Sequence, residues 1–365
     1  MKNFPKYIPM DESRLTSTSM NEVLERFKAG KPAALSRGIS IVENQRDGFE
    51  AFLHAAMQTK LQGRRIGLTG PPGAGKSSLV ALLTEFYISQ GERVGVLAVD
   101  PTSPQTGGAL LGDRIRMNDI AIDENVFIRS MATRGSLGGL AATTKEILDL
   151  MDCFGFDRLL AETVGVGQTE LEIARAVDTV VVVLVPESGD SIQAMKAGLM
   201  EIADIFIVNK ADRPGSDKLV KEVRQAIHLR SGHNFKGFAG HHGPVIEAHD
   251  TAELNELNEL DDEPGWEPLV LKTNALTGEG IQELTQAIES HREWIQGSGE
   301  LQKRRKLRTE VRIREVMHRE LVSRSIASRT VNKILTKRVE AVLSGHATPY
   351  SVAMELVDQF LEKDQ

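Results

Sequence analysis

The segment RRIGLTGPPGAGKSSLVALLTEFYISQG, at residues 64–91, limits the fold of this chain more than any other part of the sequence. Its centre, GPPGAGKS, matches the phosphate-loop pattern G-x-x-x-x-G-K-[ST], with a strand pattern before it and a helix pattern after it. Glycines in such a loop let successive backbone N–H groups turn toward phosphate oxygens. The segment therefore predicts a strand–loop–helix unit that binds phosphate, although kinases, ATPases, GTPases and transport motors all use one.

Strand patterns and helix patterns alternate along the chain, and several strand patterns are nearly continuous runs of β-branched residues and leucine. Such runs are typical of strands buried on both faces. The alternation predicts an α/β fold with a doubly wound, mainly parallel sheet. We expect strands at residues 65–70, 93–100, 125–131, 156–163, 179–186, 204–210 and 268–275.

Helix patterns also mark both ends of the chain. We expect an N-terminal helical segment at residues 1–60, a phosphate-loop domain at 61–298 and a C-terminal helical extension at 299–365. The middle domain contains an irregular acidic insertion at about 231–267, whose histidines we interpret as surface residues rather than metal ligands. The extension has an apolar stripe, which must pack against the main domain or a second copy of the chain.

Composition excludes several classes of function. The net charge of −7 predicts no general attraction to nucleic acid or to anionic membranes. The longest apolar run, residues 180–185, is too short to cross a bilayer, and the N-terminus resembles neither a signal peptide nor a transit peptide. The single cysteine, Cys153, allows no intrachain disulfide. We therefore expect a cytoplasmic protein.

The phosphate loop predicts contacts to a nucleotide. Lys76 is expected to reach the β- and γ-phosphates, and the Ser77 hydroxyl to ligate Mg²⁺ at the start of a helix. The expected nucleotide-binding residues of this loop are Gly70, Pro72, Gly73, Ala74, Gly75, Lys76, Ser77 and Ser78.

The sequence NKAD follows a buried strand pattern and indicates that the base is guanine. The Asp212 carboxylate can accept hydrogen bonds from the guanine N1–H and exocyclic amine, whereas adenine would leave that charge unpaired. Asn209 is expected to hold the base and loop, and the Lys210 stem to pack along the ring. After the next strand pattern, TNALTGEG occupies the place of a second guanine loop, with Asn274, Ala275 and Leu276 as candidates.

Acidic residues at two other strand ends are candidates for Mg²⁺ binding and catalysis. In AETVGVGQTE, Glu162 would hold a magnesium-bound water or orient the attacking one, and Gly165 would offer a backbone N–H to the γ-phosphate. Asp100 and Asp113 flank a Gly/Ser/Thr/Pro-rich loop suited to ordering around the metal and γ-phosphate. Asp113 could equally cap a helix or position water, and a catalytic role for Gln168 stays open.

The motifs GPPGAGKSS, VDPTSP, LLGDRIRM, SMATRGSLGGLA, AETVGVGQTE and NKAD occur in this order, and together they resemble the MeaB/ArgK-type GTPases. The resemblance covers about residues 15–230 closely and the C-terminal helices loosely. It implies a GTPase chaperone that gates adenosylcobalamin delivery to a cobalamin-dependent acyl-CoA mutase, with its cobalamin adenosyltransferase as a further partner. It also implies a homodimer formed through the C-terminal helices, and a mobile loop in which Lys196 acts as an activating cation.

Three alternatives remain. A nickel-type metal-insertion GTPase usually has a His-rich tail or a Cys-containing metal loop, and one cysteine with scattered histidines disfavours it. A small-molecule kinase is disfavoured by NKAD, and nothing resembles a phosphoacceptor site or a transporter contact. A scaffold that only binds nucleotide is disfavoured by the intact Lys76, Ser77 and Glu162.

Overall fold

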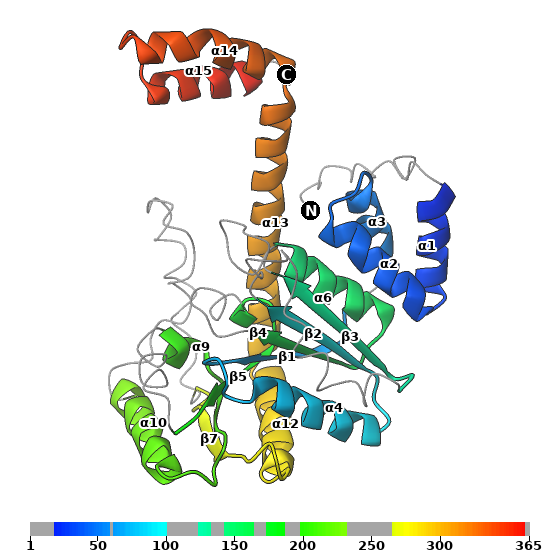
Figure 1. Ribbon diagram of the computed structural model, residues 1–365, viewed down its shortest axis with the longest axis vertical. Coiled ribbons are helices and arrows are strands. Elements are labelled where there is room, and N and C mark those ends of the chain that lie inside the picture. Colours follow the sequence, from blue (N-terminus) through cyan, green and yellow to red (C-terminus); the bar gives the residue numbers. More distant parts are fainter. Residues whose placement is uncertain are drawn as a thin grey trace, which may run out of the picture. The chain divides into compact units, whose positions relative to one another are not determined.

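The computed structural model describes residues 18–58, 61–100, 123–132, 142–163, 173–186, 198–231 and 265–361. The chain divides into two compact units, Met1–Leu301 and Gln302–Gln365. The first unit contains a β-sheet with helices on both faces, and the second is helical (Figure 1).

Seven strands form one sheet in the order β3-β2-β4-β1-β5-β6-β7, and every neighbouring pair is parallel. This sheet confirms the predicted doubly wound α/β fold. The strands are β1 (Arg64–Thr69), β2 (Val94–Asp100), β3 (Val126–Ala132), β4 (Arg158–Thr163), β5 (Thr179–Leu184), β6 (Ile205–Val208) and β7 (Leu269–Lys272).

The strand order reverses at β1, which lies between β4 on one side and β5 on the other. In open parallel sheets, ligands bind where the order reverses, at the carboxyl ends of the strands. Every residue of β4 and β5 is buried, as expected for central strands with helices on both faces. The topology therefore places the phosphate loop, which follows β1, at the position where such sheets bind ligands.

Two helices cover one face of the sheet: α4 (Lys76–Ser89) and α12 (Ile281–Gly297) (Figure 1). Leu79 and Leu83 of α4, both fully buried, pack in one hydrophobic cluster with Leu68 of β1. The opposite face is covered by α6 (Ala142–Phe154) and α10 (Ser216–Ser231), whose apolar residues form a second cluster with the sheet. A short helix, α9 (Met200–Ile202), precedes β6.

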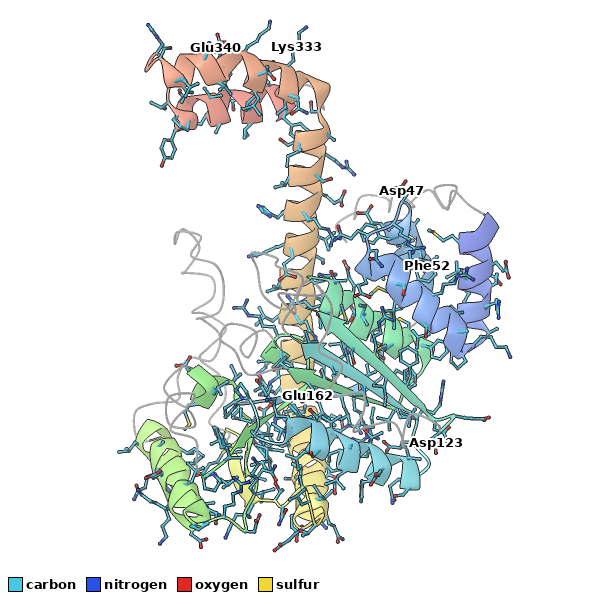
Figure 2. The ribbon with its side chains drawn as sticks, viewed as in Figure 1. Asp47, Phe52, Asp123, Glu162, Lys333 and Glu340 are labelled. Carbon is cyan, nitrogen blue, oxygen red and sulfur yellow. The ribbon has the colours of Figure 1, made fainter. Side chains whose placement is uncertain are left out.

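Three N-terminal helices extend the second cluster: α1 (Thr18–Lys28), α2 (Pro32–Glu43) and α3 (Phe49–Ala56). Phe27 of α1 packs against Phe52 of α3 and Phe154 of α6, with ring centroids 6.2 and 5.3 Å apart. Figure 2 shows Phe52 among these helices. The hydrophobic cluster continues from these helices into the sheet, so they belong to the same compact unit.

Buried ion pairs hold the amino ends of the central strands. Arg65 of β1 is 4% exposed and its Nη2 lies 2.8 Å from Asp149 Oδ1 and 2.9 Å from Asp152 Oδ2 of α6. Arg158 of β4 pairs with Glu92 and with Glu289 of α12. These pairs join the helices of both faces to the sheet at the amino ends of its strands, opposite the end that carries the phosphate loop.

The second unit consists of α14 (Arg329–Leu343), α15 (Pro349–Leu361) and most of α13 (Glu300–Ala327). α14 and α15 form a helical hairpin (Figure 1), with Arg338 Nη2 2.9 Å from Glu355 Oε1. Each helix exposes a stripe of large apolar side chains: Leu335, Val339 and Leu343 on α14, and Tyr350, Met354 and Val357 on α15. Among the helices that the structure describes, none has the length and apolar character needed to cross a membrane.

Candidate nucleotide-binding site

The phosphate loop turns sharply between β1 and α4 because its glycines adopt left-handed backbone angles. Gly70 and Gly75 have φ values of +135° and +90°. A Cβ atom at Gly70 would lie 2.1 Å from the Val183 carbonyl oxygen of β5, and one at Gly75 would lie 2.3 Å from Asn209 Nδ2. Both glycines are therefore required by sterics as well as by dihedral angle. The candidates Pro72, Gly73, Ala74 and Ser78 lie in this turn or in the first turn of α4.

Two functional side chains of the loop are buried at the start of α4. Lys76 Nζ donates to the carbonyl oxygens of Gly70 and Pro71 at 2.8 and 3.0 Å. The Ser77 hydroxyl donates to Glu162 Oε1 of β4 at 2.6 Å. Figure 2 shows Glu162 at the end of the sheet where α4 begins. The structure thus brings together a lysine, a serine and a carboxylate from two separate sequence motifs.

Ser77 and Glu162 suit a small divalent cation. Mg²⁺ prefers oxygen ligands and is held in nucleotide sites by one or two protein oxygens together with phosphates. The Ser77 hydroxyl and the Glu162 carboxylate supply such oxygens, and the two residues are only 7% and 4% exposed. The donor set therefore fits the Mg²⁺ that the sequence predicts. Among the described residues, this site included, no group of three or more His, Cys, Asp or Glu side chains could hold a metal ion.

Asn209 joins three loops at the carboxyl ends of the strands. Its side-chain amide donates to the Ala74 carbonyl of the phosphate loop at 2.8 Å. Its Oδ1 accepts from the Thr273 hydroxyl and from the Ala275 backbone N–H, each at 3.1 Å. Asn209 is 1% exposed and all of its polar side-chain atoms are used. The predicted base-binding loops are therefore bonded to each other and to the phosphate loop.

The residues that would contact the base directly lie next to Asn209 and reach solvent. Lys210 has a φ of +57°, an uncommon angle for a residue other than glycine, and Asp212 is exposed. Leu276 is 91% exposed, and its backbone N–H donates to Asn274 Oδ1 at 3.0 Å. The Asp212 carboxylate and the Leu276 side chain are therefore accessible to a bound base, as the predicted contacts need.

The predicted second guanine loop, TNALTGEG, is also held in place where it begins. Lys272 Nζ donates to Asp217 Oδ1 of α10 at 2.7 Å. This hydrogen bond and the lysine charge lower the pKa of the Asp217 carboxyl. Thr273, the next residue, is fully buried and bonded to Asn209. The sequence motifs assign no role to Thr273, although it lies between a strand pattern and the predicted guanine loop.

Several predicted residues cannot be placed in this site. Asp113, Gly165, Gln168 and Lys196 lie outside the described residues. Asp100 ends β2, and its side chain is likewise outside the description. The roles assigned to these residues stay predictions.

A parallel sheet with a phosphate loop at the end of its central strand, together with a bonded N-K-x-D loop, defines a P-loop GTPase. Residues 35–330 match the family model described as methylmalonyl Co-A mutase-associated GTPase MeaB. The chain belongs to this family, and it is an enzyme that hydrolyses GTP. The predicted family resemblance and the predicted GTPase activity are both confirmed.

Relatives from all three domains of life are similar over most of the chain. A protein of Pyrococcus abyssi named as a GTPase is 43% identical over 82% of this chain and 84% of its own. GTPase ArgK of Escherichia coli is 35% identical over 79% of this chain and 80% of its own. The mitochondrial methylmalonic aciduria type A homolog of Mus musculus is 32% identical over 91% of this chain and 77% of its own. The solved structure of an LAO/AO transport system kinase has a TM-score of 0.60 and 26% identity, covering 96% of this chain and 100% of that one.

Proposed function

We propose that this GTPase is a chaperone that gates adenosylcobalamin delivery to a cobalamin-dependent acyl-CoA mutase, such as methylmalonyl-CoA mutase, and protects that mutase in the cytoplasm. The observation that supports this most is the family match over residues 35–330, because the family is described by its association with methylmalonyl-CoA mutase. The name of the mouse relative refers to a disorder of methylmalonate and points the same way. A cobalamin adenosyltransferase is a proposed second partner.

The proposed chemistry is the attack of water on the γ-phosphorus of GTP, which breaks the bond to the β–γ bridging oxygen. Lys76 binds the β- and γ-phosphates, and Ser77 and Glu162 hold Mg²⁺, with Asp100 and Asp113 completing the acidic shell. When bound, Mg²⁺ neutralises charge that develops on the phosphate oxygens. Asp113 and Gly165 are proposed to position water and the γ-phosphate. The 2.6 Å contact between Ser77 and Glu162 supports the metal assignment.

The experiment that tests the chaperone role measures binding and rate together. The full-length protein is mixed with purified methylmalonyl-CoA mutase in the presence of GTP, GDP or no nucleotide, and complex formation is followed by calorimetry. We expect the affinity to depend on the nucleotide, and the mutase to accelerate GTP hydrolysis. Binding that is absent or identical in all three states would exclude the chaperone role while leaving the GTPase intact.

A variant separates docking from activation. Lys196→Ala is expected to retain mutase binding and basal GTP hydrolysis but to lose the mutase-dependent acceleration. The matched control is Lys218→Ala, because Lys218 is an exposed lysine on α10. Equal acceleration of both variants would show that Lys196 is not the activating cation. Hydrolysis without an added phosphate acceptor distinguishes the GTPase from the alternative kinase.

We also propose that the C-terminal extension forms a homodimer. The stripe that exposes Leu335, Val339 and Leu343 on α14 recurs every four residues, as expected for one face of a helix. On α15, Tyr350, Met354 and Val357 form a similar stripe. Exposed apolar surface of this kind favours association with another protein surface. The proposal assigns both stripes to the contact between two copies of the chain.

Light scattering of the full-length protein tests the dimer. Val339→Glu places a charge in the stripe and is expected to shift the protein to monomer, because burying an unpaired charge is costly. Lys333→Glu introduces the same side chain at an exposed position of α14 outside the stripe (Figure 2) and is expected to leave the dimer intact. A dimer that survives Val339→Glu would show that α14 does not form the contact.

A further inference from the structure

A buried pair of threonines links the phosphate-loop strand to the strand that bears Glu162. The Thr163 hydroxyl of β4 donates to the Thr69 hydroxyl of β1 at 3.0 Å. Both side chains are fully buried. Thr69 immediately precedes the first glycine of the phosphate loop, and Thr163 immediately follows Glu162. The sequence motifs do not assign a role to either threonine.

The position of this pair at the end of the strand ladder gives it a specific effect. The backbone register between β1 and β4 ends at Leu68 opposite Glu162. One residue further on, the backbone of Thr163 is still paired with Val99 of β2. On the other side of β4, Thr163 is linked to β1 by its side-chain hydrogen bond to Thr69. It therefore extends the connection between the two strands beyond their backbone ladder.

The two threonines lie on the opposite face of the sheet from Glu162. Successive residues of a strand point to opposite faces. Leu68, the register partner of Glu162, packs in the cluster beneath α4, and Glu162 reaches Ser77 of that helix. The end of β4 is thus held on one face by the Glu162–Ser77 contact and on the other by the Thr163–Thr69 contact.

From this geometry we infer that Thr69 and Thr163 are positioning residues that hold the Glu162 carboxylate against Ser77. A rotation of the strand end about its own axis moves Glu162 and Thr163 in opposite directions, so a bond that restrains Thr163 also restrains Glu162. The pair is buried and acts through Glu162. This inference rests on the proposed role of Glu162 in Mg²⁺ binding.

Mg²⁺-dependent release of a fluorescent GDP analogue from the full-length protein tests the inference without a catalytic readout. Thr163→Val and Thr69→Val keep the side-chain shape and remove one partner of the bond. Each is expected to raise the Mg²⁺ concentration that half-maximally slows release by about threefold to tenfold, the change equivalent to one hydrogen bond. The release rate without Mg²⁺ is expected to stay unchanged. The double variant is expected to match the single ones, because all three lose the same bond.

Control variants distinguish positioning from a general loss of stability. Thr84 of α4 is also buried, and its hydroxyl donates to the Val80 carbonyl at 2.7 Å. Thr84→Val removes a comparable buried bond and is expected to leave the Mg²⁺ dependence unchanged. Thr163→Ser keeps the hydroxyl and is expected to restore the wild-type dependence. If Thr163→Val does not fold, Thr69→Val tests the same bond from the other strand.

The outcomes separate this inference from the function on which it rests. Glu162→Gln is expected to raise the Mg²⁺ requirement more than either threonine variant. If Glu162→Gln raises it and neither threonine variant does, the positioning role is wrong and the Mg²⁺ role of Glu162 stands. If Glu162→Gln leaves it unchanged, the Mg²⁺ assignment is wrong and the inference fails with it.

Discussion

The side-chain amide of Asn209 donates to the backbone carbonyl of Ala74 at 2.8 Å, which bonds the predicted guanine loop to the phosphate loop. The same side chain accepts from Thr273 and Ala275. A nucleotide spans the distance between base and phosphates, so its affinity depends on how these loops are held relative to one another. We therefore expect Asn209 to support binding at both ends of the ligand.

Asn209→Ala is expected to weaken the binding of both GTP and GDP. Losing its hydrogen bonds leaves buried backbone groups unpaired, at about 1–3 kcal/mol each, so affinity is expected to fall about tenfold to a hundredfold. Titration calorimetry with GDP measures this loss. Asn44→Ala is the control, since Asn44 is exposed and its side-chain amide donates to the Ser40 carbonyl of α2 at 2.7 Å. Wild-type affinity in the Asn209 variant would contradict the bridging role.

Asp212→Asn is expected to change base preference from guanine toward xanthine. An amide offers a donor where xanthine has a carbonyl, and it loses the charged acceptor that guanine needs. Hydrogen bonds to charged groups contribute about 1.5–3 kcal/mol, so GTP affinity is expected to fall at least tenfold. Competition between GTP and xanthosine triphosphate measures the shift. Asp47→Asn makes the same change at an exposed aspartate outside the site, and equal selectivity in both variants would refute the assignment.

Gly75→Ala is expected to disrupt nucleotide binding through a clash. The added methyl group would lie 2.3 Å from Asn209 Nδ2 and displace the amide that holds the phosphate loop. Gly91→Ala shares the left-handed strain, with φ of +79°, but has no atom within 4 Å of its Cβ. Each variant is expected to lose about 1–2 kcal/mol of stability from strain. Only Gly75→Ala is expected to lose GDP affinity, and similar affinities in the two variants would argue against the clash.

Tyr87→Phe is expected to leave the first unit as stable as the wild type, or to stabilise it by up to about 1 kcal/mol. The Tyr87 hydroxyl is buried and has no hydrogen-bond partner among the described residues. Burial raises the pKa of this hydroxyl well above its ordinary value, so it stays neutral. The ring contact with Arg158, at 4.3 Å, survives the change. Urea unfolding measures the difference.

The control for this change is Tyr350→Phe, at a tyrosine that is 83% exposed. Its effect on stability is expected to be negligible. A loss of more than about 1 kcal/mol in Tyr87→Phe would show that the buried hydroxyl has a partner, such as an ordered water.

His291→Ala is expected to destabilise the first unit by about 2–4 kcal/mol. His291 is fully buried on α12, with Nδ1 2.9 Å from the Thr179 hydroxyl and Nε2 3.2 Å from Asp204 Oδ1. The two tryptophans of the chain, Trp266 and Trp294, both pack against its ring. Tryptophan emission therefore reports directly on this cluster.

In the His291→Ala variant, the emission maximum of the native protein is expected to move to longer wavelength, and the urea midpoint to fall. His346→Ala, at an exposed histidine of the second unit, is expected to change neither. Unchanged emission together with an unchanged midpoint in His291→Ala would mean that the cluster does not support the fold.

Local patterns were sufficient for much of this molecule. The strand before GPPGAGKS, the helix after it and the parallel arrangement of the sheet follow from glycine freedom, burial periodicity and the alternation of strands and helices. Glu162 was predicted as a site residue from its place at a strand end. Thr273 was not, because a threonine hydroxyl has no pattern that shows which distant group it will contact.

The sequence alone determined the family, the fold class and the phosphate-binding loop, because each can be inferred from motifs and burial patterns along the chain without knowing which distant residues meet. Only the tertiary structure decided that Ser77 meets Glu162, that Asn209 meets Ala74 and that Thr163 meets Thr69. These partners are separated by 85, 135 and 94 positions. Their contacts depend on the order in which the strands assemble, and that order places β1 between β4 and β5.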